Sequence, residues 1–238
     1  MKSEQLNSFC EKRCGNPAFR DDCTKPDVSA ESVESAGYSF KTTAEKERLR
    51  LFIAVDVDIQ SIRHIQESSS LLNLLDELRR CGNNLRVVRP CNLHITLKFL
   101  GDTSAALLPI ICRAIEESTA GTSVFVIRLS GMGAFPSMNS VRVVWVGVDG
   151  AEPMSAISLN LDKSLAKIGV KPEVRPFSPH LTVARAAGGH GAMSAVRDII
   201  DKNAHRYFGE IIVDKIHLKK STLAPNGPLY DTIYTVTL

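Results

Sequence analysis

Two short motifs, His94-x-Thr96 and His180-x-Thr182, stand 86 residues apart at matching points of a repeated pattern. In each copy an amphipathic helical stretch precedes the motif, the motif lies in a short apolar strand, and a further helix and strands follow. A shift of 86 residues carries Asp76 onto Asp162 and brings 124–130 onto 210–216. Such a duplication predicts two similar lobes related by a pseudo-twofold axis, which brings the two motif strands together at the junction.

Hydrophobic period and turn residues predict alternating helices and strands. A buried strand begins at Arg48. Helices are expected at 59–80, 104–119, 153–168 and 191–204. Further strands are expected at 92–100, 122–130, 141–148, 180–184, 210–218 and 231–237. A Gly/Pro/Asn loop is expected between the strands 122–130 and 141–148. The predicted fold class is therefore α+β, with two pseudo-twofold-related lobes. Each is a mostly antiparallel sheet with helices on the outer face, and the active-site cleft lies between them.

The first 47 residues differ in character from the rest. They are poor in large apolar residues and carry seven Lys/Arg and nine Asp/Glu, whereas residues 48–238 carry 22 and 17. We interpret 1–47 as a flexible N-terminal extension and 48–238 as one bilobal, modestly basic domain. Cys10, Cys14 and Cys23 lack a fourth ligand at a familiar zinc spacing, so we interpret all six cysteines as thiols, with a zinc clip as the alternative.

The location expected for this chain is cytoplasmic. No stretch approaches the roughly 18 consecutive apolar residues that cross a bilayer. The first residues lack the apolar segment of a signal peptide, and their acidic residues argue against a transit peptide. Nothing in the sequence requires more than a monomer.

Strand alternation makes each motif a unit with one imidazole and one hydroxyl on a single face. Unperturbed histidine titrates near pH 6.5, so a base and an acid can coexist in one site near neutrality. The base takes a proton from water that attacks a phosphodiester, and the acid protonates the departing oxygen. The threonine hydroxyls suit the non-bridging phosphate oxygens. Neither motif has a nearby carboxylate or second histidine to complete a metal site, so we expect no metal and no cofactor.

Three further residues are candidate substrate contacts, each with an alternative. Lys98 continues the face of His94 and is either a phosphate or RNA-backbone contact or a solvated lysine. Arg185 lies five residues after His180, so it reaches the cleft only if the strand bulges or ends; otherwise we expect a salt bridge. Phe135, in the predicted loop, either presents its ring to a base or packs in the core.

The remaining aromatic and histidine residues have simpler interpretations. Trp145 and Tyr230 are expected in the core or at the lobe junction. His64, His190, His205 and His217 show no pairing and are expected as ordinary surface or core histidines.

Over residues 48–238 the chain resembles the 2H phosphoesterases, and among them the RNA 2′,3′-cyclic phosphodiesterases, also known as 2′-5′ RNA ligases. The likeness rests on RLFIAVDVD, NLHITLKFLGD, the GAFPS loop with VRVVWVGV, FSPHLTVARA and IHLKKSTLAPNGPLY. Residues 1–47 match no part of this pattern.

The resemblance implies two lobes around a basic cleft and the opening of an RNA 2′,3′-cyclic phosphate to a 2′-phosphate. By the same resemblance His94 is the proton donor to the leaving 3′ oxygen, His180 is the proton acceptor from water, and Thr96 and Thr182 hold the phosphate. The expected partners are RNA ends or nucleotides that bear a 2′,3′-cyclic phosphate. Two alternatives stay open: ligation of such an end to a 5′-hydroxyl, and a nucleotide- or RNA-binding module without turnover.

Overall fold

A computed structural model describes residues 47–63, 65–82, 84–187, 193–225 and 227–238, whose strands form two antiparallel sheets. The first sheet has the strand order β3 (His94–Ser104), β1 (Arg48–Asp56), β8 (Lys215–Ala224), β9 (Gly227–Thr237). The second sheet has the order β2 (Leu85–Val87), β6 (His180–Ala186), β5 (Ser140–Asp149), β4 (Phe125–Ser137), β7 (Tyr207–Val213).

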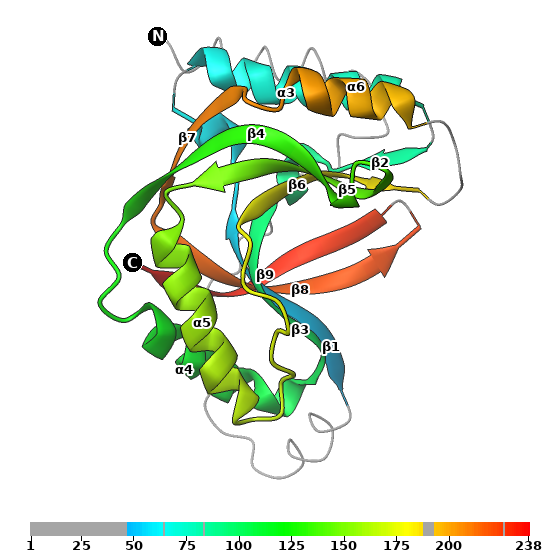
Figure 1. Cartoon of the computed structure of the whole chain (residues 1–238). Helices are drawn as coiled ribbons and strands as arrows, with labels where there is room; N and C mark the ends of the chain where they lie inside the picture. The colour runs from blue at the N-terminus through cyan, green and yellow to red at the C-terminus, as the bar shows by residue number, and fades with distance from the viewer. Residues whose placement is uncertain (1–46, 64, 83, 188–192, 226) are drawn as a thin grey trace, which may run out of the picture. The chain divides into compact units, whose positions relative to one another are not determined.

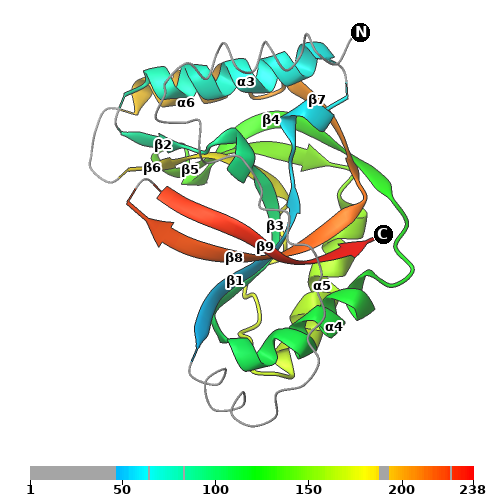
Figure 2. The same cartoon turned by 180° about the vertical axis from the view of Figure 1, so that it is seen from behind.

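Two helices pack on each sheet (Figures 1 and 2). The first sheet carries α4 (Leu108–Thr119) and α5 (Glu152–Ala166), and the second carries α3 (Ile65–Arg80) and α6 (Ser194–Lys202). Three short 3₁₀ turns lie at Ile59–Ser61, Pro90–Asn92 and Ala105–Leu107. The predicted α+β class, with antiparallel sheets and helices on their outer faces, is confirmed.

The helix that precedes each motif packs on the sheet of the other motif. Helix α3 leads toward β3 but contacts β2 and β7 of the second sheet, while α5 leads toward β6 but contacts β3 of the first. The chain remains in the second sheet until the Val88 N–H donates to the Val183 carbonyl at 2.8 Å, and it enters the first sheet at His94. The two predicted lobes are therefore interleaved and not consecutive along the chain.

The 86-residue repeat is clear in the helices. A shift of 86 carries α3 onto 151–166, against Glu152–Ala166 for α5, and carries α4 onto 194–205, against Ser194–Lys202 for α6. The strands follow it less well. The strand expected at 210–218 is two strands, β7 and β8, which meet at Asp214 and belong to different sheets.

The loop expected around Phe135 is also corrected. Strand β4 continues through this segment to Ser137 and pairs with β5 as far as the Ser137–Ser140 register. Pairing with a long neighbouring strand outweighs the turn-forming tendency of the glycines and the proline, because strand preference depends strongly on tertiary context. The sequence pattern does not predict strand β2, which has three residues.

The hydrophobic core lies between the sheets and their helices. On the motif strand β3 the core residues include Ile95 and Leu97, and on the motif strand β6 they include Leu181 and Val183. The other face of each motif strand is therefore left for polar chemistry. None of the described helices is long and apolar enough to span a bilayer.

Some expectations concern residues whose structure is not described. They are the extension over residues 1–46 with Cys10, Cys14 and Cys23, and the two histidines His64 and His190. Among the described cysteines, Cys81 and Cys112 are free thiols, as expected.

Candidate active site

The two motif strands are the strands through which the two sheets touch, since β3 contacts β6 (Figure 1). Both strands have the same order of burial over six residues from the histidine: half-buried, buried, half-buried, buried, buried, exposed. The half-buried positions are His94 and Thr96 on one strand and His180 and Thr182 on the other. Each histidine thus shares a face with its threonine, away from the core.

The fifth and sixth positions depart from simple alternation because each strand contains a β-bulge. In β3, Thr96 lies opposite Ala54 and Lys98 opposite Ile53, so Leu97 is the extra residue. In β6, Val183 is the extra residue in the same way. Both bulged carbonyls are satisfied: the Ser158 hydroxyl donates to Leu97 at 2.9 Å, and the Val88 N–H donates to Val183 at 2.8 Å. Bulges re-aim the side chains that follow them.

The bulge in β3 overturns the expectation that Lys98 shares the face of His94. Lys98 is 1% exposed, and its ammonium donates to Asp162 Oδ1 at 2.5 Å and to the Lys171 carbonyl at 2.8 Å. Glu173 adds a carboxylate oxygen at 3.6 Å. Lys98 therefore fastens β3 to α5 and to the segment that leads to His180, and it does not share the face of His94.

The bulge in β6 has the opposite effect on Arg185, which it turns to the exposed face that carries His180 and Thr182. The positive charge of Arg185 acts to lower the pKa of His94, of His180 and of Tyr230. These three groups come from both sheets, so the charge of Arg185 acts on both halves of the site. The bulge that would let Arg185 leave the buried face is present in β6. A contact of Arg185 with substrate stays a prediction.

Both histidine rings are held by the same hydrogen bond. The Nδ1–H of His94 donates to the Asn92 carbonyl, and that of His180 donates to the Ser178 carbonyl, each at 2.7 Å and each two residues back. Because a carbonyl only accepts, the proton of the neutral ring is on Nδ1. This leaves Nε2 of each ring with a lone pair, ready to accept a proton or, once protonated, to donate one.

Aromatic side chains pack against both rings. The His94 ring lies 5.0 Å from Phe52 and 5.1 Å edge-on from Tyr230, and the His180 ring lies 5.1 Å edge-on from Phe135 (centroid distances). The ring of Trp145 lies 5.4 Å from the ring of Phe135. Phe135 therefore supports His180 from a strand and is not presented by a loop.

A glycine makes room for the indole. Gly133 pairs with Trp145 across β4 and β5, and a Cβ at Gly133 would come within 2.2 Å of the Trp145 ring. The indole therefore lies flat over β4 beside Phe135, where any larger residue than glycine would displace it.

Burial is the largest influence on the titration of the two histidines, and it lowers the pKa of both below the usual value for histidine. In each case the hydrogen bond to the backbone carbonyl raises the pKa in part. The Asp56 carboxylate also acts to raise the pKa of His94 and the Lys219 ammonium acts to lower it, whereas among the described side chains the charged group that acts on His180 is Arg185. The two rings are therefore electrostatically different despite their matching hydrogen bonds.

Asp56 is held in place by Lys219. The Lys219 ammonium donates to both Asp56 oxygens, at 2.8 and 2.7 Å, and to Thr232 Oγ1 at 3.1 Å. Lys219 is 6% exposed, so this cation is committed to Asp56. Within the described ranges, no group of three or more His, Cys, Asp or Glu side chains is arranged to hold a metal ion.

Comparison with known proteins decides the family. The model of the 2′-5′ RNA ligase superfamily matches residues 62–223. This chain belongs to that superfamily. It is 34% identical over 183 residues to the RNA 2′,3′-cyclic phosphodiesterase of Methanothermobacter thermautotrophicus, covering 77% of this chain and 95% of the relative. It is 37% identical over 182 residues to that of Archaeoglobus fulgidus, covering 76% and 96%.

Solved structures agree on the fold of this superfamily member. A protein of Thermus thermophilus superposes with a TM-score of 0.65 at 25% identity, over 80% of this chain and 98% of the other. E. coli LigT in complex with 3′-AMP superposes with a TM-score of 0.61 at 23% identity, over 81% and 99%. The family resemblance found in the sequence is thus confirmed.

Four residues around the site were not predicted as site residues from the sequence: Phe52, Asp56, Lys219 and Tyr230. Of these, only Tyr230 was expected in the core or at the lobe junction. Phe52 and Asp56 lie on β1 at the positions that alternate with the core residues Leu51, Ile53 and Val55, so strand alternation indicated the face that they share. No local sequence pattern predicts Lys219 and Tyr230 at the site, because their position depends on the pairing of β8 with β1. His217 is likewise not isolated, since its Nδ1 lies 2.9 Å from Thr235 Oγ1.

Proposed function

We propose that this protein hydrolyses the 2′,3′-cyclic phosphate at RNA 3′ ends to a 2′-phosphate, by histidine acid–base catalysis without a metal ion. The observation that carries the proposal is the matched pair of histidines, each with Nδ1 bound to a carbonyl and Nε2 left for the substrate. The relatives at 34% and 37% identity are RNA 2′,3′-cyclic phosphodiesterases, which supports the same substrate class for this chain.

In the proposed reaction His180 is the base. Its Nε2 takes a proton from a water molecule as the water oxygen bonds to phosphorus. The bond from phosphorus to the 3′ oxygen breaks, and the protonated Nε2 of His94 gives its proton to that oxygen. The product carries a 3′-hydroxyl and a 2′-phosphate. Each proton transfer of this kind contributes about 10²–10⁴-fold to the rate.

The Asp56 carboxylate supports this assignment of acid and base. It acts to raise the pKa of His94 and so favours the protonated ring that a proton donor needs. Arg185 acts to lower the pKa of both rings and Lys219 acts to lower that of His94, so Asp56 is the feature that favours protonation of His94 over His180.

The other groups of the site suit a phosphate. Thr96 and Thr182 each offer a hydroxyl on the face of their histidine, suited to the non-bridging oxygens on which charge accumulates. The exposed guanidinium of Arg185 offers a fork of N–H donors that matches phosphate oxygens. The half-buried rings of Tyr230 and Phe135 pack on the two histidines and suit the terminal nucleoside.

The test uses an oligoribonucleotide that ends in a 2′,3′-cyclic phosphate, incubated with the protein and excess EDTA. We expect complete conversion to the 2′-phosphate, separated from the 3′-phosphate isomer by chromatography. Absence of conversion would contradict the proposed activity, and activity that needs an added divalent ion would contradict the mechanism. Binding of a 2′-nucleotide without any turnover would favour the non-catalytic module.

Ligation uses the same site with a 5′-hydroxyl in place of water as the nucleophile: its oxygen bonds to phosphorus, the bond to the 3′ oxygen breaks, and a 2′-5′ linkage forms. Water is present at about 55 M, so hydrolysis is favoured unless the two RNA ends are held together. Adding a second RNA with a 5′-hydroxyl, annealed to a splint, measures the two products in one reaction. We expect the 2′-phosphate to dominate.

A further inference from the structure

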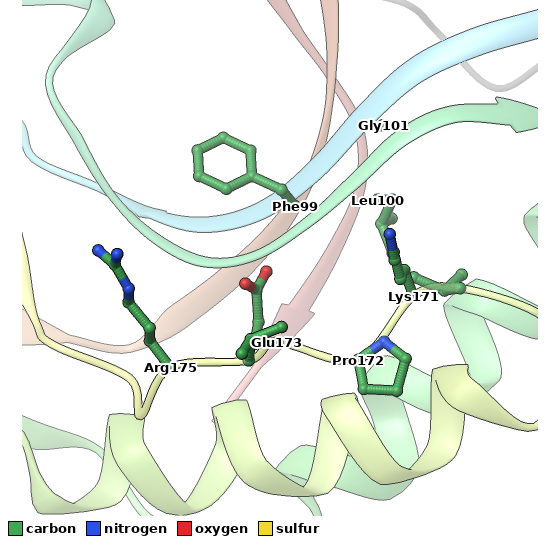
Figure 3. A pocket seen from close by; sticks show the side chains of 9 residues that line it. Phe99, Leu100, Gly101, Lys171, Pro172, Glu173 and Arg175 are labelled. Carbon is green, nitrogen blue, oxygen red and sulfur yellow. The ribbon is translucent and has the colours of Figure 1, made fainter.

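A groove of about 530 Å³ lies beside the site, at the point where β3 leaves the histidine motif (Figure 3). One wall is the segment Phe99–Gly101 of β3. The other wall is the segment Val170–Arg175, which leads to His180. In Figure 3 the ring of Phe99 projects over the groove, and the side chains of Glu173 and Arg175 rise toward it from the opposite wall.

The groove is continuous with the proposed active site through a row of rings. The bulge at Leu97 turns Phe99 to the face that carries His94, in the same position on β3 that Arg185 holds on β6. Phe52 lies between the two, with its ring 5.0 Å from His94 and 6.3 Å from Phe99. A chain that leaves the site along β3 therefore meets Phe99 next.

Phe99 is unusually open for an aromatic side chain, at 58% exposed. Exposing a ring forfeits the burial that normally stabilises it, by about 25 cal/mol for each Å² left in water. A flat, solvent-facing ring in a groove is the form that nucleobase-stacking residues take in single-stranded nucleic acid sites.

The opposite wall supplies positive charge. Arg175 is exposed, and the described part of the chain provides it with no ion pair or hydrogen bond. Lys171 is also exposed, and its backbone carbonyl is fixed by the buried ammonium of Lys98. The carboxylate of Glu173 faces the groove too, but it is partly neutralised by Lys98 at 3.6 Å. The wall is thus held rigidly and presents more positive than negative charge.

We propose that this groove binds the RNA chain on the 5′ side of the cyclic phosphate, with the penultimate base stacked on Phe99 and a backbone phosphate paired with Arg175. The inference rests on the proposed function and extends it from a single terminal nucleotide to a longer RNA. The terminal nucleoside has its own rings around the histidines, so the exposed ring beyond Phe52 serves the nucleotide that follows.

The experiment compares adenosine 2′,3′-cyclic phosphate with a hexanucleotide that ends in the same group. We expect the wild-type protein to prefer the hexanucleotide in kcat/KM. Phe99→Ala should reduce that preference at least about fivefold, the loss expected for one stacked base. Phe99→Leu keeps an apolar side chain but removes the flat ring, and it should reduce the preference similarly. Arg175→Gln should reduce it and should flatten its dependence on salt, since one phosphate contact is lost.

Two exposed residues of α4 provide matched controls, Ile110→Ala for the ring and Arg113→Gln for the charge. An equal preference in the wild-type protein, or an unchanged preference in Phe99→Ala, Phe99→Leu and Arg175→Gln, would overturn the proposal. If the wild-type protein hydrolyses neither substrate, the proposed function fails instead. A binding measurement then tests the groove separately. Phe99→Ala should weaken the binding of a hexanucleotide with a 2′-phosphate end more than it weakens the binding of adenosine 2′-monophosphate.

Discussion

The ammonium of Lys98 and the carboxylate of Asp162 lie 2.5 Å apart and join the strand of the first histidine motif to the helix that precedes the second. The same Asp162 oxygen accepts the backbone N–H of Glu173 at 3.0 Å. Through this one carboxylate, β3, α5 and the segment leading to His180 are fixed together. The pair therefore holds the two motifs in relation to one another from outside the cleft.

Lys98→Ala is expected to lower the free energy of unfolding by about 3 kcal/mol, because removing one partner leaves the other charge of a largely buried pair uncompensated. Urea denaturation measures this directly. The exposed pair of Arg113 and Glu117 provides the control, and Arg113→Gln should cost less than about 0.5 kcal/mol. Equal losses in the two variants would show that the Lys98 pair has no special role.

His94→Ala and His180→Ala should each lower kcat at least about 100-fold, because each removes one of the two proton-transfer groups. Binding should survive, and it is measurable through the fluorescence of Trp145, the single tryptophan, as adenosine 2′-monophosphate is added. The control is His205→Ala, which should keep the wild-type rate because His205 is exposed and lies outside both motif strands. A wild-type rate in either motif variant is incompatible with the mechanism.

The rate should fall as the pH rises above about 6.5, the usual pKa of histidine. Burial lowers the pKa of both His94 and His180, so both rings of the free enzyme are largely neutral above that value. The reaction needs one protonated and one neutral ring, and the singly protonated fraction then decreases about tenfold for each pH unit. A profile of kcat/KM from acidic to alkaline pH tests this; a maximum above about pH 8 would contradict it.

Arg185→Gln should raise the pKa of both motif histidines, because the cation that disfavours their protonated forms is removed. Titration of the histidine ring protons by NMR measures the two values without any substrate. The same variant should raise KM by about tenfold, since one charged contact to phosphate is lost. Arg128→Gln, at an exposed pair with Glu210, is the control and should move neither quantity. Unmoved histidine titrations in Arg185→Gln would place the guanidinium outside the site.

Asp56→Asn tests the assignment of acid and base. The substitution removes a carboxylate that raises the pKa of His94, so that pKa should fall further while that of His180 stays unchanged. Because the buried Lys219 then loses its partner, the double variant Asp56→Asn/Lys219→Met should be compared with the single variant. A shift confined to His180 would reverse the assignment.

Local pattern predicted the parts of this fold that depend on near neighbours. Strand period placed His94 with Thr96 and His180 with Thr182, and helical period placed α3, α4, α5 and α6 within a few residues of their observed bounds. The bulges at Leu97 and Val183 arise from pairing with β1 and β5, distant in sequence, so the prediction for Lys98 chose the wrong face. The division of 210–218 at Asp214 and the rings around His94 depend on the same long-range pairing.

The exchange of α3 and α5 between the two sheets has a consequence for the origin of such a chain. A half-length polypeptide with these connections cannot cover its own sheet, because its leading helix belongs on the sheet of another copy. To keep the same helix contacts, two half-length copies would have to exchange that helix, as in a domain-swapped homodimer, with one motif histidine from each copy. In a single chain the same exchange is independent of concentration and links the two sheets into one cooperative unit.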